Sequence, residues 1–388
     1  MRTLLFAVFS VAVLALATSV PRAQPADDWI MYVGTYTRAP SKGIYAYRFQ
    51  GATGAVTPMG TAGLAAETVN PSFLAVHPNQ RFLYAVNEIS NYEGGRDGSV
   101  SAFAIDRATG TLTLLNRVSS RGADPCHLAV DKSGKWLFVA NYSGGSIAAF
   151  PVQDDGKLGA SSAFFQHAGK SVNPARQTGP HGHAVVVSPD NKFVLAADLG
   201  LDKVFTYRLD PAAGGLAPGE PPFTSTTPGG GPRHLDVRPD GKFAYVLNEM
   251  LSSVGAFSYD AARGTLAHLQ TISTLPPGFA AENSGAEIVV HPGGRFLYTS
   301  NRGQDSIAVF GIDAAKGTLT PVDGISTQGR TPRGFAIDPS GRFLVAGNQN
   351  SSTLVVFRID QATGALTPAG TKLEVPTPVS VVFVKKDL

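Results

Sequence analysis

One pattern of about 50 residues recurs six times along the chain. Each copy contains an apolar run, a turn rich in Pro, Asp and Gly, and a second apolar run that ends on polar residues. The copies are FLAVHPNQRFLYAVNE (73–88), HLAVDKSGKWLFVANY (127–142), AVVVSPDNKFVLAADL (184–199), HLDVRPDGKFAYVLNE (234–249), EIVVHPGGRFLYTSNR (287–302) and GFAIDPSGRFLVAGNQ (334–349). Most are followed by two more strand-like segments, S-[VI]-x-x-F and D-x-x-x-G-x-L-T. Four short strands in each repeat of this length are typical of a β-propeller, so we expect an all-β fold.

The two ends of the chain complete one another as parts of a single repeat. Residues 30–36, 43–49 and 56–60 match the second, third and fourth strands of a repeat, but no first strand precedes them. Residues 377–384 match a first strand that has no second strand after it. We therefore expect the last strand to complete the first blade, which removes an open sheet edge. The prediction is a ring of seven four-stranded blades closed by the C-terminal strand.

The first 23 residues are a different kind of sequence. Arg2 provides a positive start, residues 4–17 are an apolar run, and Ala23 is a small residue suited to a cleavage point. This arrangement is typical of a secretory signal peptide, and the apolar run is short for a membrane-spanning helix. An uncleaved membrane anchor is the alternative. We expect residues 1–23 to be removed and residues 24–388 to form a single propeller domain, periplasmic or extracellular, without membrane association after cleavage.

Charge and cysteine content narrow the classes of partner. The net charge is +3, and removal of the leader leaves 30 basic against 29 acidic residues. The chain therefore lacks the basic field that binds nucleic acid or anionic membranes.

Cys126 is the only cysteine, which excludes an internal disulfide. We expect it to be a small buried residue at a strand entrance, because adjacent strand residues such as His127 point to opposite faces and do not form a Cys–His pair. A ring without open edges favours a monomer.

The repeat geometry predicts where polar side chains gather. The first strand of each blade lines the axis and the second runs antiparallel to it, so first-strand starts and second-strand ends lie on one face of the ring. The polar residues at these positions are His127, His183, Arg233, His234, Glu287 and Arg333, and Glu88, Asn141, Asp198, Glu249, Arg302 and Gln349. His77 and His291 precede turn prolines instead, and we expect both at the surface. Ionisable groups gathered at one mouth of the axis indicate a binding or catalytic pocket.

The local motifs do not point to a metal or a cofactor. GPHGH (179–183) and GPRH (231–234) match neither a zinc spacing, a phosphate loop nor a nucleophile elbow. His181 and His183 are spaced like two metal ligands, and a carboxylate such as Glu249 or Glu287 on the same face is the kind of group that completes such a site. Because no third ligand is evident in the sequence, we expect no metal and no cofactor.

Four segments carry a resemblance to a known family. They are GPRH (231–234), NEMLSSV (248–254), GRFLYTSNR (294–302) and TPRGFAIDPSGRFL (331–344). With them, nearly the whole chain after the leader resembles the seven-bladed lactonases, which are typified by the propeller-type 6-phosphogluconolactonase and the fungal carboxymuconate cyclase. The resemblance implies no metal requirement. It also implies a catalytic set of four residues, His183, Arg233, Glu249 and Arg302.

Lactone hydrolysis needs a base for the attacking water and a positive group for the oxyanion that develops. We expect Glu249 or His183 to be the base, and the two arginines of the set to stabilise the oxyanion or to bind a carboxylate or phosphate of the substrate. The residues expected to bind substrate around this set are His127, His181, His234, Glu287, Arg333 and Gln349. For the histidines at 127 and 234 the alternative is a structural role in lining the channel, and for the arginines it is a salt bridge between blades.

Three functions fit these residues. The first is an exported lactonase that hydrolyses a small sugar-derived or otherwise anionic lactone. The second is a muconate-type cycloisomerase, in which the same arginines bind carboxylates. The third is a non-catalytic propeller that binds a ligand or a protein, because a fold does not fix a function. Residues 90–98 extend one second-to-third strand connection, and we expect them to form a flexible loop on the rim of the pocket.

Overall fold

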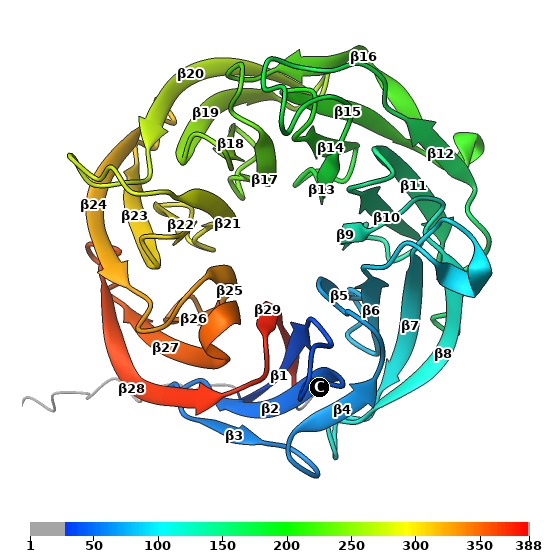
Figure 1. Cartoon of the computed structure of the whole chain (residues 1–388), viewed down its shortest axis with the longest axis vertical. Helices are drawn as coiled ribbons and strands as arrows, with labels where there is room; N and C mark the ends of the chain where they lie inside the picture. The colour runs from blue at the N-terminus through cyan, green and yellow to red at the C-terminus, as the bar shows by residue number, and fades with distance from the viewer. Residues whose placement is uncertain (1–27, 387–388) are drawn as a thin grey trace, which may run out of the picture.

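Seven antiparallel sheets surround a central axis in the computed structural model of the protein, which describes residues 28–386 (Figure 1). Six sheets have four strands, and the seventh has a fifth short strand beside its third. The all-β, seven-bladed prediction is therefore confirmed. The predicted signal peptide, residues 1–23, lies outside the described residues. Within residues 28–386, no helix has the length and apolar character needed to span a membrane.

The strands fall into four concentric sets. The inner strands are β5 (Leu74–Val76), β9 (Pro125–Val130), β13 (Gly182–Val187), β17 (Pro232–Val237), β21 (Ser284–Val290), β25 (Pro332–Ile337) and β29 (Pro378–Lys385). The second strands are β6 (Phe82–Asn87), β10 (Trp136–Asn141), β14 (Phe193–Asp198), β18 (Phe243–Asn248), β22 (Phe296–Arg302), β26 (Phe343–Asn348) and β1 (Asp28–Thr35). The third strands are β7 (Ser99–Ile105), β11 (Ser146–Pro151), β15 (Lys203–Asp210), β19 (Ser253–Asp260), β23 (Ser306–Ile312), β27 (Thr353–Ile359) and β2 (Gly43–Gln50).

The outer strands vary more in length than the others. They are β8 (Leu112–Ser119), β12 (Ala163–Gln166), β16 (Gly215–Ser225), β20 (Thr265–Ser273), β24 (Leu319–Ser326), β28 (Leu366–Glu374) and the split pair β3 (Val56–Pro58) and β4 (Leu64–Glu67). Three single-turn 3₁₀ helices complete the described chain: η1 (Tyr92–Gly94), η2 (Pro211–Ala213) and η3 (Gln349–Ser351).

The ring closes where the two ends of the chain meet. Strand β29 pairs antiparallel with β1, so that Met31 lies opposite Phe383 and Val33 opposite Val381. Figure 1 shows β29, in red, beside the blue β1. The first blade is thus completed by the C-terminal strand, as the incomplete end repeats predicted.

Each blade is packed against the preceding one by the turn between its third and fourth strands. Gly264 has a φ of +70°, and a Cβ added to it would lie 2.6 Å from the Phe193 ring of the preceding blade. Only glycine fits this position, because it needs both the left-handed backbone and the missing side chain. The same contact is made by Gly54 with Phe343, Gly156 with Phe82, Gly317 with Phe243 and Gly364 with Phe296. The repeated turn glycine therefore specifies blade-to-blade packing as well as a hairpin.

Histidines in the turns after the inner strands also join neighbouring blades. His291 is 7% exposed, and its Nε2 lies 2.8 Å from the carbonyl oxygen of Gly341 in the next blade. His77 is half-buried and makes the equivalent contact with Gly134 at 2.9 Å. The prediction of a surface position was therefore wrong for His291, because each ring bridges to a neighbouring turn instead of facing solvent.

Most inner strands begin with a β-bulge. In β13, Gly182 pairs with Asp198 and Ala184 with Ala197, so His183 is an extra residue without a partner. Similar shifts occur at the starts of β9, β17, β21 and β25, and the additional residues include Cys126, Arg233 and Arg333. A bulge changes the direction of side chains that would otherwise alternate between faces. It allows successive residues at these strand starts to approach the axis.

The first prediction concerns the packing at the closure. Phe343 is fully buried between the last blade and the first, with its ring 5.7 Å from that of Phe49. Replacement by alanine leaves a cavity, so we expect Phe343→Ala to lower the free energy of unfolding by about 3–5 kcal/mol in urea denaturation. Phe164, which is 39% exposed, provides the control, and Phe164→Ala should cost less than about 1 kcal/mol. Equal losses in both variants would contradict this account of the closure.

Candidate active site

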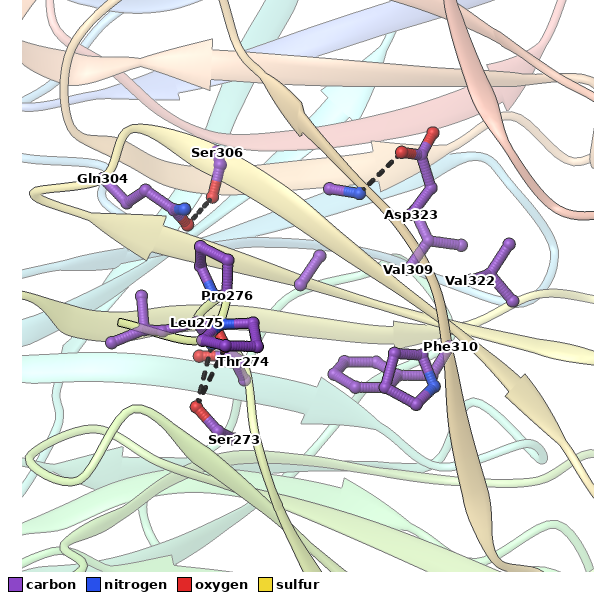
Figure 2. Close-up of a pocket in the computed structure, with 14 residues that line it drawn as sticks. Ser273, Thr274, Leu275, Pro276, Gln304, Ser306, Val309, Phe310, Val322 and Asp323 are labelled. Carbon is purple, nitrogen blue, oxygen red and sulfur yellow. Dashed lines mark hydrogen bonds between the residues drawn. The ribbon is translucent and has the colours of Figure 1, made fainter. Parts of the chain in front are cut away.

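A polar pocket of about 350 Å³ lies where the strand starts and strand ends meet at the axis. Its lining residues are Glu88, Cys126, Tyr142, Arg176, His183, Glu249, Ser284, Arg302 and Arg333. We call it the axial pocket. A second pocket of similar volume, about 320 Å³, lies away from the axis against β23 and β24 (Figure 2). Asp323 is its only ionisable lining residue, and Pro276, Phe310 and Val322 make it largely apolar. The groups needed for acid–base chemistry are therefore concentrated in the axial pocket.

Three arginines surround the carboxylate of Glu249. Its Oε2 lies 3.1 Å from Nε of Arg233 and 2.9 Å from Nη2 of Arg302, and its Oε1 accepts a hydrogen bond of 2.9 Å from Nη2 of Arg176. The Glu249 side chain is only 8% exposed. Burial alone would raise the pKa of Glu249, but Arg302 and Arg233 outweigh it and hold that pKa well below its usual value. The carboxylate is therefore ionised at neutral pH.

The two buried arginines are fixed by the backbone of β21 as well as by the carboxylate. Arg233 donates to the carbonyl oxygen of Ala286, and Arg302 donates to that of Gly285 at 2.7 Å. Burial and the charge of Arg233 lower the pKa of Arg302 to about 10. Burial and the charge of Arg333 also lower the pKa of Arg233. Because these carbonyl contacts hold the guanidinium groups in place, the two arginines are preorganised around Glu249.

His183 faces the same carboxylate from the bulge of β13. Its Nε2 lies 4.0 Å from Oε2 of Glu249, and its Nδ1 lies 3.7 Å from Sγ of Cys126. Burial, followed by the charge of Arg233, lowers the pKa of His183 well below its usual value, so the ring is neutral. Burial raises the pKa of Cys126, which stays a thiol at the strand entrance. The expectation of a small buried cysteine at a strand entrance is confirmed.

Arg333, at the start of β25, also lines the axial pocket. Its guanidinium lies over the ring of Tyr36 at 5.4 Å, and the Tyr36 hydroxyl donates to both carboxylate oxygens of Glu88, at 2.9 and 2.8 Å. Within the described part of the chain, no carboxylate lies within 4.0 Å of Arg333. Arg333 therefore offers the pocket a positive charge that no ion pair compensates.

Three of the predicted residues lie outside the axial pocket. His127, His234 and Glu287 line a separate cavity of about 300 Å³ with apolar walls. His234 Nδ1 lies 2.7 Å from Oε1 of Glu287, and the ring of His127 stacks on Phe73 at 3.9 Å. Burial raises the pKa of Glu287 to about 7. These residues line a cavity other than the axial pocket, a position that matches the structural alternative for the two histidines.

Two further predicted residues lie beside the pocket without lining it. The His181 ring stacks on Tyr142 at 4.5 Å and supports that side chain. Gln349 begins η3 and is half-buried. Among residues 28–386, no three His, Cys, Asp or Glu side chains are grouped to hold a metal ion.

Tyr142 and Arg176 line the axial pocket but were not predicted. Tyr142 occupies the repeat position of Glu249, directly after a buried strand-end asparagine. Alignment on these asparagines would have identified Tyr142, whereas the prediction used Asn141 itself. Asn141 is structural, because its Nδ2 donates to Ser120 O and Ser146 Oγ. Arg176 belongs to the irregular link between β12 and β13, for which the repeat gives no signal.

The second prediction uses the buried His127. Burial and the neighbouring His234 lower its pKa well below 6.5, so below that pH only the unfolded state takes up this proton. Stability is therefore lost as the pH falls through the unfolded pKa. In His127→Gln we expect the slope of unfolding free energy between pH 6.5 and 5 to fall by up to about 1.4 kcal/mol per pH unit in urea titrations. The exposed His268→Gln is the control. An unchanged slope in His127→Gln would contradict a neutral His127.

Known proteins share both the sequence and the fold of this chain. The family model of the seven-bladed β-propeller lactonases matches residues 30–383. The 6-phosphogluconolactonase of Bacillus subtilis is 38% identical over 310 residues, which cover 80% of this chain and 85% of the relative. That of Formosa agariphila is 35% identical, over 79% of this chain and 86% of the relative. The periplasmic gluconolactonase structure from Pseudomonas aeruginosa superposes with a TM-score of 0.85 at 38% identity, covering 92% of this chain and 99% of that one. The chain belongs to the seven-bladed β-propeller lactonase family.

Proposed function

We propose that the protein is an exported lactonase that hydrolyses a small anionic lactone in the axial pocket. The observation that carries the proposal is the arrangement of charge: one ionised carboxylate is surrounded by three arginines, and a fourth arginine in the same pocket has no ion pair. An excess of fixed positive charge favours an anionic substrate and the oxyanion of acyl transfer. The relatives named as 6-phosphogluconolactonases and as a gluconolactonase support this class of reaction.

In the proposed reaction, Glu249 takes a proton from water while the water oxygen attacks the lactone carbonyl. The neutral ring of His183, whose Nε2 lies 4.0 Å from the Glu249 carboxylate, can orient the attacking water beside that carboxylate. Arg333 stabilises the oxyanion, because it lines the pocket, lies over the Tyr36 ring and has no ion pair. Collapse of the tetrahedral intermediate breaks the bond to the ring oxygen, which takes the proton from Glu249. The product is an open-chain hydroxy acid.

The third prediction tests this assignment directly. Acid release by the purified mature protein would be followed against the spontaneous rate for δ-gluconolactone, its 6-phosphate and simple γ-lactones. We expect Glu249→Gln to lower kcat on the preferred lactone by about 10²–10⁴-fold, because the base is lost. The control is Glu374→Gln, at an exposed position on β28. We expect a chelator to leave the activity unchanged.

Two outcomes would contradict the site or the function. Activity that survives the loss of both Arg233 and Glu249 would refute the site. Absence of turnover on every lactone, combined with cyclisation of an unsaturated diacid, would favour the cycloisomerase, since the same arginines suit two carboxylates. Ligand binding without turnover of either kind would favour a binding protein.

Export is the second part of the proposal. Its support is the signal-like sequence of residues 1–23 and the periplasmic description of the relative from Pseudomonas aeruginosa. The fourth prediction is that the protein recovered from the periplasm or the medium begins near Gln24. Mass spectrometry of the intact protein measures this, and retention of residues 1–23 in the cell fraction would contradict export.

A further inference from the structure

The link between β12 and β13, residues 167–181, is the longest connection between an outer strand and the next inner strand. We call it the strap. It is held at both ends by one carboxylate, because Asp198 Oδ2 contacts His167 Nδ1 at 2.6 Å and Asp198 Oδ1 accepts from the backbone N–H of His181 at 2.8 Å. Its middle is fixed by the fully buried Gln177, which donates to the Leu199 carbonyl at 2.8 Å. The strap backbone is therefore anchored at the edge of the axial pocket.

One side chain of the strap reaches the catalytic carboxylate. The strap turns tightly at Asn173, whose Oδ1 accepts from the backbone N–H of Arg176 at 3.1 Å. Nη2 of Arg176 then donates to Glu249 Oε1 at 2.9 Å and to the Tyr142 hydroxyl at 3.2 Å. The Arg176 side chain is 45% exposed. A fixed backbone thus presents a solvent-accessible guanidinium at the pocket opening.

Arg176 differs from the other two arginines that contact Glu249. The side chains of Arg233 and Arg302 are 3% and 15% exposed, both contact Oε2, and both are tied to backbone carbonyls of β21. Arg176 contacts Oε1 in a part-buried ion pair, and its remaining bond is to the hydroxyl of Tyr142 at the exposed edge of the pocket. An ion pair with one solvent-accessible partner is weaker than a fully buried one that backbone hydrogen bonds also hold. An anion that enters the pocket can therefore replace Glu249 as the partner of Arg176 more easily than as the partner of the buried Arg233 or Arg302.

We propose that Arg176 is the specificity-determining residue for a substrate anion remote from the lactone ring, and that it exchanges Glu249 Oε1 for that anion when substrate binds. This inference rests on the proposed lactonase function. The substrates it selects are lactones that carry a phosphate or a carboxylate away from the ring carbonyl. Guanidinium groups bind both anions through paired hydrogen bonds.

The exchange also prepares the base. With Arg176 on the substrate, Oε1 of Glu249 loses its hydrogen-bond donor and becomes free to accept the proton of the attacking water. The water oxygen bonds to the carbonyl carbon, the bond to the ring oxygen breaks, and that oxygen takes the proton from Glu249. A neutral lactone leaves Arg176 on Glu249 and meets a weaker base. Anionic substrates therefore gain in binding and in turnover together.

The fifth prediction compares substrates in matched variants. The kcat/KM values are measured for δ-gluconolactone, its 6-phosphate and glucaro-1,4-lactone with wild type, Arg176→Gln, Arg176→Lys and Arg263→Gln. We expect Arg176→Gln to lower the ratio of kcat/KM for the phosphorylated over the unphosphorylated lactone by about 10- to 100-fold, whatever the absolute rates. Arg176→Lys should restore part of the ratio. Arg263 lies in an exposed turn of another blade, and its variant should keep the wild-type ratio.

The glucarolactone arm distinguishes the two anions. A loss confined to the phosphorylated lactone assigns Arg176 to phosphate, and a loss confined to glucarolactone assigns it to carboxylate. Either result supports the proposal. An equal loss on charged and uncharged lactones would overturn it, because Arg176 would then only hold Glu249 in place. Unchanged kcat/KM ratios of both charged lactones over δ-gluconolactone would overturn it as well.

Calorimetric binding separates this inference from the proposed function. The probes are 6-phosphogluconate, glucarate and gluconate, which need no turnover. If wild type hydrolyses no lactone, the proposed function fails, and binding alone decides the role of Arg176. A preference for 6-phosphogluconate or glucarate over gluconate that disappears in Arg176→Gln supports the anion site, and equal binding of all three acids by wild type overturns it. Melting temperatures of the variants show whether each has folded.

Discussion

The pairing of β29 with β1 is the interaction on which the rest of the structure depends. Each blade presents one face to each neighbour, so a ring with one incomplete blade would expose apolar residues such as Phe49 and Val381 and leave strand β1 with unpaired backbone groups. Antiparallel hydrogen bonds between residues more than three hundred positions apart remove both costs at once. The closed ring then fixes the starts of all inner strands around one axis, which is where the polar groups gather.

The axial pocket shows how a scaffold of apolar blades holds several charges at its centre. Burial of Glu249 would be costly alone, because an uncompensated charge is poorly solvated inside a protein. Arg233 and Arg302 offset this cost and are themselves held by backbone carbonyls. The compensation has a chemical consequence, since a carboxylate stabilised by arginines is a weak base. The proposed exchange of Arg176 from Glu249 to the substrate would resolve this conflict between stability and reactivity.

The sequence predicted the ring, its closure and most of the pocket because all three follow from the period of the repeat. Alignment on apolar runs placed Glu249, Arg233 and Arg302 correctly at the axis. It could not reveal the bulges, which let successive residues at the strand starts approach the axis, so that both His183 and Arg233 face Glu249. A bulge depends on backbone pairing, not on residue type. Arg176 lies outside the repeat altogether, so only the folded strap brings it to Glu249.

Each blade contributes at least one group around the pocket, and Tyr36, Glu88, Tyr142, His183, Glu249, Arg302 and Arg333 follow one another around the ring. No subset of the blades therefore contains the complete pocket. If any one blade opens, at least one residue of the pocket is displaced. In a domain whose site lies in one lobe, another part can unfold locally without loss of activity. Here local unfolding of any blade should stop catalysis, because every blade carries part of the site. In this architecture the blade that opens most readily therefore limits how long the protein stays active.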